Sequence, residues 1–148
     1  MKLVGLVSSL LKHKGSQIWG LAPTATVYDA VEMMSDRHVG ALLVLEDGKL
    51  AGVISERDYA RKVILKGKSS KETPVREIMT TPVITVAPGE TVEHCMQLMT
   101  DHRIRHLPVV EEGKVVGVLS IGDLVKWTIS AQEELLQQLE NYITGKYA

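Results

Sequence analysis

Apolar and polar positions follow one another along the chain in a pattern that occurs twice. In the first copy, four apolar residues recur at the spacing of one face of a helix: Val27, Ala30, Val31 and Met34. This spacing predicts an amphipathic helix, which would begin at Thr26 as its N-cap. The apolar run at 41–45 is too short for a helix and indicates a buried strand. A Glu-Asp-Gly-Lys turn at 46–49 and an apolar run at 50–54 complete a predicted hairpin.

The same layout returns 65 residues later. Residues 18–64 align with 83–129 without a gap, and 16 of these 47 pairs are identical. Most of the other pairs match apolar with apolar, so the chain contains an internal duplication. Each copy begins with a short apolar strand, 18–21 or 83–86, and ends with a helix. The predicted fold is therefore α/β (α+β), with two β-α-β-β-α units packed with pseudo-twofold symmetry.

The duplication divides the chain into five parts. We expect a short N-terminal helix at 1–15, a first repeat at 16–65, a polar linker at 66–78, a second repeat at 79–130 and a helical tail at 131–148. The tail carries leucines on one side: Leu135, Leu136 and Leu139. These leucines either pack on their own domain or form a dimer contact, and the sequence leaves both open.

Composition narrows the class of protein. The 148 residues are 45% hydrophobic and contain no Phe, so the core is expected to be aliphatic. Seventeen basic and eighteen acidic residues give a net charge of −1, which argues against nucleic acid as a partner. The single cysteine, Cys95, cannot form an intramolecular disulfide and favours a reducing compartment. Apolar runs are too short for a membrane span, so we expect a cytoplasmic protein with no membrane partner.

The repeated segment that could carry chemistry is the turn Gly-Val-Ile-Ser-Glu-Arg-Asp at 52–58, which returns as Gly-Val-Leu-Ser-Ile-Gly-Asp at 117–123. In one interpretation, Ser and Asp three residues later form a capping box that starts a helix. In the other, the carboxylate beside a helix N-terminus binds both hydroxyls of a ribose. Spacing alone does not separate the two.

These features together resemble a tandem pair of CBS domains, also called a Bateman module. The resemblance rests on the duplicated β-α-β-β-α unit, the two Ser-x-x-Asp turns and the Arg-His-Leu-Pro-Val-Val segment at 105–110. It covers about residues 16–130. Such stand-alone CBS-pair proteins imply a bound adenosine ligand, most often AMP, ADP or ATP and sometimes S-adenosylmethionine or NAD.

The resemblance also implies roles for individual residues. Ribose would be bound by the repeated acid and serine pairs, Asp58 with Ser55 and Asp123 with Ser120. Adenine would lie against backbone and apolar side chains from both repeats: Ile18, Trp19, Val39, Gly40, Val53, Val83, Ile84, Ile104 and Val118.

Phosphate needs cations, and the two copies differ where these would stand. Arg105 and His106 align with Gly40 and Ala41, and Arg57 aligns with Gly122. Because CBS pairs often bring phosphate-binding residues from the opposite repeat, we expect Arg105 and His106 at the Asp58 site and Arg57 at the Asp123 site. Arg103 is a further candidate. The guanidinium fork suits phosphate, although such residues can equally be solvated surface charges.

No motif indicates a catalytic or metal centre. His94, His102 and His106 with Cys95 lack the spacing of a metal site, and the sequence has no Walker-type loop. We therefore expect a non-enzymatic regulatory protein that binds an adenosine nucleotide and signals to a partner protein. The alternatives are a ligand-independent dimeric interaction module and a nucleotide-processing enzyme. A homodimer is expected, because the methionines at 33–34 and 96–99 and the leucine tail leave apolar helix faces to cover.

Overall fold

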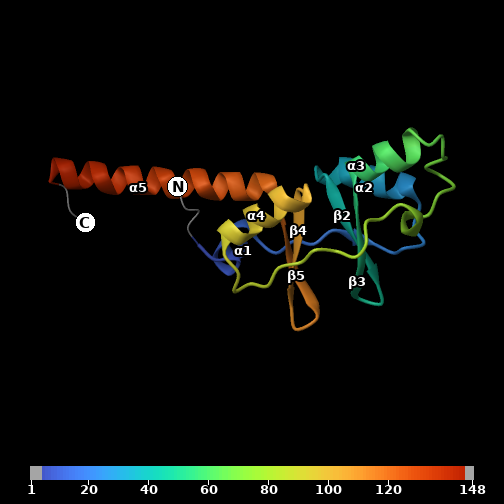
Figure 1. Ribbon diagram of the computed structural model, residues 1–148, viewed down its shortest axis with the longest axis horizontal. Helices are drawn as coiled ribbons and strands as arrows, with labels where there is room; N and C mark the ends of the chain where they lie inside the picture. The colour runs from blue at the N-terminus through green and yellow to red at the C-terminus, as the bar shows by residue number, and fades with distance from the viewer. Residues whose placement is uncertain (1–4, 146–148) are drawn as a thin grey trace. The chain divides into compact units, whose positions relative to one another are not determined.

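The computed structural model describes residues 5–145, which divide into two compact units (Figure 1). The first-repeat unit consists of Gln17–Thr85 with Val110–Val116. The second-repeat unit consists of the described residues up to Ser16, Val86–Val109, and the described residues from Gly117 onward. The N-terminal segment therefore belongs to the unit of the second repeat, although the first repeat follows it in sequence.

The first-repeat unit is built on a three-stranded sheet in the order β1-β2-β3. β1 (Gly20–Leu21) pairs in parallel with β2 (Ala41–Glu46), and β2 pairs antiparallel with β3 (Lys49–Ser55). The hairpin turn has positive φ at Asp47 (51°) and Gly48 (77°). Two successive left-handed residues define a type I′ turn, which explains the Asp-Gly pair in the sequence.

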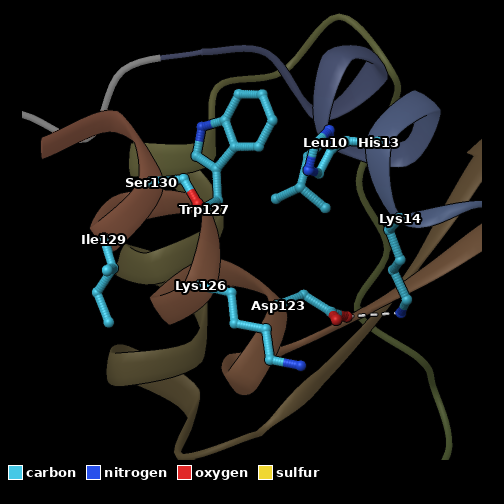
Figure 2. Close-up of a pocket in the computed structure, with 8 residues that line it drawn as sticks. All are labelled: Leu10, His13, Lys14, Asp123, Lys126, Trp127, Ile129 and Ser130. Atoms are coloured by element: carbon cyan, nitrogen blue, oxygen red, sulfur yellow. Dashed lines mark hydrogen bonds and ion pairs between the residues drawn. The ribbon is translucent and has the colours of Figure 1, made fainter. Parts of the chain in front are cut away.

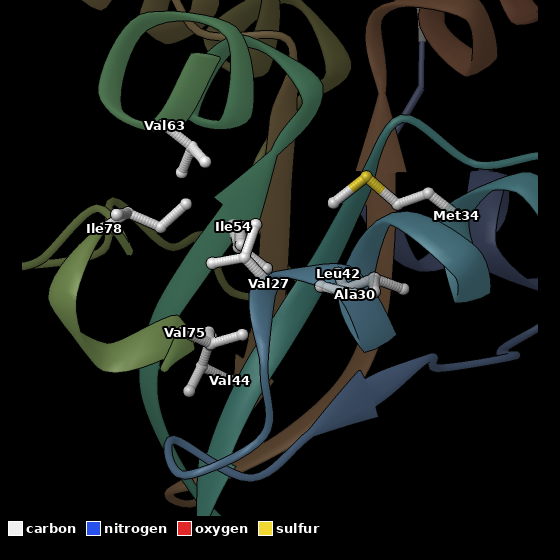
Figure 3. Close-up of a cluster of buried hydrophobic side chains, with 9 residues drawn as sticks. All are labelled: Val27, Ala30, Met34, Leu42, Val44, Ile54, Val63, Val75 and Ile78. Atoms are coloured by element: carbon white, nitrogen blue, oxygen red, sulfur yellow. The ribbon is translucent and has the colours of Figure 1, made fainter. Parts of the chain in front are cut away.

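Helix α2 (Val27–Arg37) covers this sheet and confirms the predicted amphipathic pattern. The Thr26 hydroxyl accepts a hydrogen bond from the Asp29 N–H at 3.1 Å, as an N-cap does. The buried face of α2 joins apolar side chains of the hairpin and of the following segments, as Figure 3 shows: Val27, Ala30, Met34, Leu42, Val44, Ile54, Val63, Val75 and Ile78. The chain continues from β3 into α3 (Glu56–Tyr59) and a π-helical turn, η1 (Ala60–Ile64).

The last part of the predicted linker is not a free connection. Val75, in the 3-10 turn η2 (Val75–Glu77), and Ile78 are both fully buried in the same cluster. The Val75 N–H also donates to the Ala25 carbonyl at 2.8 Å. The chain therefore remains bound to the first-repeat unit until it reaches the second repeat.

The second repeat reproduces the helix and the hairpin. Its elements are α4 (Val92–His102), β4 (His106–Glu111), β5 (Lys114–Ser120) and α5 (Ile121–Thr144). Thr91 caps α4 by accepting from the His94 N–H at 3.0 Å. Its buried face consists of Val92, Cys95 and Met99. Helix α1 (Val7–Lys14) lies within the segment expected to form a short N-terminal helix, 1–15. Residues 1–4 and 146–148 lie outside the described part.

The predicted first strand of the second repeat, 83–86, is wrong in extent. It is reduced to an isolated bridge between Val86 and Val109. In the first repeat, the Leu43 N–H donates to the Trp19 carbonyl and extends the parallel pairing. The residue aligned with Leu43 is Pro108, which has no N–H to donate to Ile84.

Candidate functional site

The first Ser-x-x-Asp turn joins the end of β3 to the start of α3. The Asp58 N–H donates to the Ser55 hydroxyl at 3.2 Å, and the Ser55 N–H donates back to Asp58 Oδ2 at 2.9 Å. The Ser55 hydroxyl also lies 3.1 Å from this oxygen. This reciprocal pair is a capping box, so the structural interpretation of the motif is confirmed.

Two further donors reach the other oxygen of Asp58. Thr80 Oγ1 and Lys62 Nζ each lie 3.1 Å from Asp58 Oδ1. The backbone of Thr80 pairs with Val53 in both directions, which fixes its position beside β3. Asp58 is 7% exposed, so a buried carboxylate here is satisfied by groups of its own unit.

The second turn, between β5 and α5, has the same capping box and a different third partner. The Ser120 N–H donates to Asp123 Oδ2 at 2.7 Å, and the Asp123 N–H donates to the Ser120 hydroxyl at 3.1 Å. From α1, the Lys14 ammonium lies 2.5 Å from Asp123 Oδ2 and also donates to the Val118 carbonyl. The Asp123 side chain remains 19% exposed. The second carboxylate, Asp123, is therefore paired with Lys14 from α1.

The electrostatics of the second turn follow from these contacts. Burial by itself raises the pKa of Asp123, but hydrogen bonds from Lys14 and from the Ser120 N–H outweigh it, so the pKa lies below its ordinary value. Burial is also the main reason that the pKa of His106 is lowered, and the charge of Lys14 adds to it. The Asp123 carboxylate opposes this shift. At neutral pH, Asp123 is ionised and His106 is uncharged.

A pocket of about 450 Å³ adjoins Asp123 between α1 and α5 (Figure 2). Figure 2 shows the side chains of Lys14 and Lys126 on two sides of the Asp123 carboxylate, with the Trp127 indole farther along α5. The His13 ring meets this indole edge-on, at 6.1 Å between centroids. Cationic, aromatic and acidic groups thus share one pocket, whose size is that of small-molecule sites.

The predicted phosphate-binding arginines, Arg57, Arg103 and Arg105, are all exposed. The Arg105 carbonyl accepts from the N–H of Ile121 at 2.9 Å, as the Gly40 carbonyl does from Glu56 at 3.1 Å. Arg105 and His106 therefore adjoin the turn of their own repeat. Their assignment to the Asp58 site, and that of Arg57 to the Asp123 site, involves both units and stays a prediction.

The predicted adenine-pocket residues share one property, since all are half-buried: Ile18, Trp19, Val39, Gly40, Val53, Val83, Ile84, Ile104 and Val118. The Trp19 ring lies 4.1 Å below the Arg37 guanidinium and packs against the core cluster of Figure 3. Its carbonyl accepts from Leu43 in the sheet, so the backbone group predicted for adenine already has one partner.

Sequence reasoning missed the residues that close on the carboxylates: Thr80, Lys62 and Lys14. Lys62 follows Asp58 by four residues, the spacing of a helical ion pair, so it could have been found. Thr80 comes from the start of the second repeat, before its predicted first strand, and Lys14 comes from the N-terminal helix α1. Under the 65-residue shift, Thr80 corresponds to Gly15, the residue after Lys14. The repeat pattern does not predict, however, that either segment reaches a Ser-x-x-Asp turn.

Within residues 5–145, no three or more His, Cys, Asp or Glu side chains form a group able to hold a metal ion. In the same part of the chain, no helix is both long and apolar enough to span a membrane.

A duplicated α/β unit with an acidic capping box at the end of each hairpin defines a two-repeat α/β module. The family model for the CBS domain matches residues 17–65 and 75–130, and the chain belongs to the CBS-domain family.

Relatives agree with this assignment. A mitochondrial CBS domain-containing protein of Arabidopsis thaliana, CBSX3, is 46% identical over 95% of this chain and 73% of its own length. A CBS-domain protein from Burkholderia ambifaria MC40-6, whose name refers to signal transduction, is 47% identical with a TM-score of 0.83, covering 86% of this chain and 96% of that one. The CBS domain pair of protein MJ0100, solved with 5-methylthioadenosine and S-adenosyl-L-methionine, is 26% identical with a TM-score of 0.74, covering 83% and 94%.

Proposed function

We propose that this chain is a regulatory CBS-pair protein that binds an adenosine nucleotide, AMP, ADP, ATP or NAD, and signals its presence to a partner protein. The observation that supports the proposal is the recurrence of one acidic strand-to-helix turn in both repeats, at Asp58 and Asp123. The adenosine compounds bound to the similar MJ0100 pair favour the same class of ligand.

The chemistry of each turn suits a ribose. A carboxylate accepts two hydroxyl hydrogen bonds at once, and the adjacent helix N-terminus favours negative charge on the ligand. Asp123 is ionised at neutral pH because its pKa is lowered. Serine hydroxyls at Ser55 and Ser120 would face the sugar, and Arg57, Arg105, His106 and Arg103 remain the proposed phosphate partners.

The test is calorimetric titration of AMP into the wild-type chain and into the double variant Asp58→Asn, Asp123→Asn. Hydrogen bonds to a charged group contribute roughly 1.5–3 kcal/mol, so the double variant should bind AMP about tenfold or more weakly. Unchanged AMP affinity in a folded double variant would contradict ribose binding by the two aspartates and leave them only a structural role in the capping boxes.

We also propose a homodimer, which rests on the predicted leucine tail and not on the methionines Met34 and Met99. Met34 and Met99 are buried in their own units at 4% and 2% exposure, so they are not available for an interface. Exposed apolar side chains gather instead along α5: Val125, Ile129, Leu135, Leu136, Leu139, Tyr142 and Ile143. A second copy is the commonest partner for such a face. Light scattering at micromolar concentration that gives the monomer mass, 16.3 kDa, would contradict it.

The exposed α5 face also supports the alternative of a dimeric interaction module that needs no ligand. Titration with AMP, ATP and NAD separates the two, since the alternative predicts no binding. Incubation with ATP or NAD followed by product analysis tests the less favoured nucleotide-processing enzyme. A cytoplasmic location stays a prediction, because one relative is named as mitochondrial.

A further inference from the structure

Lys14 contacts the carboxylate oxygen that would bind a ribose hydroxyl at the second turn. Its ammonium contacts Asp123 Oδ2 and the carbonyl of Val118, two residues before the end of β5. The Lys14 side chain is 34% exposed, and that of Asp123 is 19% exposed. A ligand hydroxyl that takes this oxygen must therefore displace an ammonium that is only partly hydrated.

The first repeat has a different arrangement at the same place. There a neutral hydroxyl, that of Thr80, reaches Asp58, and the cation Lys62 also donates to the Ile78 carbonyl at 3.0 Å. In the repeat alignment Lys62 corresponds to Trp127, and Met79 corresponds to Lys14. The cation at the first turn, Lys62, thus follows its aspartate by four residues, whereas the cation at the second turn, Lys14, comes from α1. The indole of Trp127 takes the position of Lys62 in the second repeat.

The pocket next to Asp123 offers a place for an anion. Its lining includes Lys14 and a second ammonium, Lys126, and the aromatic pair His13 and Trp127 (Figure 2). Four carbons separate the Lys14 ammonium from its backbone, so the ammonium can turn from the carboxylate into the pocket without moving α1. A phosphate there would be met by two positive charges.

We infer that Lys14 makes the Asp123 site selective for phosphorylated adenosine ligands over the free nucleoside. The inference rests on the proposed function and adds a ligand class for one of its sites. A neutral nucleoside breaks the Lys14–Asp123 ion pair and returns no charged partner to the ammonium. A nucleotide breaks the same pair, and its phosphate replaces the carboxylate as the partner of Lys14 beside Lys126. The ion pair thus weakens both ligands, and only the phosphate compensates.

The experiment compares AMP with adenosine by calorimetry in an Asp58→Asn background, which leaves the second turn as the reporting site. Lys14→Met keeps the aliphatic stem and removes the charge. It should reduce the preference for AMP over adenosine by about tenfold or more, with adenosine bound no more weakly than before. Lys14→Arg keeps a cation and should retain the preference. The matched control is Lys12→Met, an exposed position on the same helix, which should change neither ligand.

Three outcomes are decisive. If the preference for AMP is unchanged in a folded Lys14→Met variant, the inference is wrong while the proposed function stands. If AMP and adenosine weaken equally, Lys14 is a structural residue and the inference is again wrong. If the wild-type chain binds neither AMP nor adenosine, the proposed function is wrong, and the inference that rests on it is wrong as well. Circular dichroism of each variant establishes that it is folded.

Discussion

Replacing Asp58 should destabilise the protein more than replacing its counterpart Asp123. Asp58→Ala removes the acceptor for the Ser55 N–H, for the Thr80 hydroxyl and for the Lys62 ammonium. The Ser55 hydroxyl remains as the N-cap, so the cost comes from the buried donors left without an acceptor, about 1–3 kcal/mol each. The Lys62 side chain is 44% exposed, so its ion pair adds little because solvent screens it. We expect a loss of about 2–4 kcal/mol in the free energy of unfolding.

Asp123→Ala removes the same half of a capping box, the acceptor for the Ser120 N–H, from a more open position. Its partner Lys14 is 34% exposed and regains water when the carboxylate is removed, so the expected loss, mainly from the Ser120 N–H, is about 1–2 kcal/mol. Urea unfolding followed by far-ultraviolet circular dichroism measures both variants. Asp36→Ala, at an exposed position near the end of α2, is the control and should stay within about 0.5 kcal/mol of wild type. A loss below about 1 kcal/mol for Asp58→Ala, or one no larger than that for Asp123→Ala, would refute this reasoning.

The stabilising role of Asp58 has to be separated from its proposed role in binding. Thr80→Val removes one hydroxyl from the carboxylate and keeps its charge and its capping box. If Asp58→Asn weakens AMP only by loosening the unit, Thr80→Val should weaken AMP as well. If Asp58 binds ribose, Thr80→Val removes an internal competitor, and AMP should bind equally well or more tightly.

Three further predictions concern single residues. Burial raises the pKa of Cys95 to about 11, so at pH 8 its thiol should react slowly with a disulfide reagent in the folded chain and rapidly in urea; equal rates would contradict this. A Cβ added at Gly52 would lie 3.1 Å from the Thr80 carbonyl oxygen, whereas at Gly117 the nearest atoms are those of one leucine side chain, so Gly52→Ala should lower the melting temperature more than Gly117→Ala. Burial lowers the pKa of His106, so stability should fall as the pH drops from about 6.5 toward that lowered pKa; His106→Gln should flatten this dependence in urea titrations at several pH values.

Much of each repeat could be predicted because its determinants are local. Thr26 and Thr91 begin helices at the expected residues, and the Asp-Gly turn at 47–48 matches a type I′ hairpin. The capping boxes follow from Ser and Asp at a spacing of three. Helical periodicity and turn chemistry depend on residues within about ten positions of one another. Such features can therefore be predicted from the sequence without knowledge of distant contacts.

The parts that escaped prediction depend on distant partners. The first strand of the second repeat shortens because Pro108, more than twenty residues later, cannot donate to it. Lys14 meets Asp123 across 109 residues of sequence, and Thr80 meets Asp58 across 22. A lysine in an N-terminal helix has the same appearance in a sequence whether it is solvated or paired. Its partner is set by how α1 packs, through Leu10 and Leu11, in the second-repeat unit.

The internal partners of the two carboxylates suggest how binding could become a signal. A ribose at either turn would exchange existing hydrogen bonds for new ones, so its affinity would be the difference between two sets of contacts. The groups released would be Thr80, at the start of the second repeat, and Lys14, at the end of α1. Each belongs to a segment outside the two hairpins and is bound to the turn by a few polar contacts. Ligand binding would therefore loosen these two segments specifically, and amide hydrogen exchange should rise at Thr80 and at the end of α1 when AMP is added. Exchange that slows at both segments would show that the ligand adds to these contacts and does not replace them.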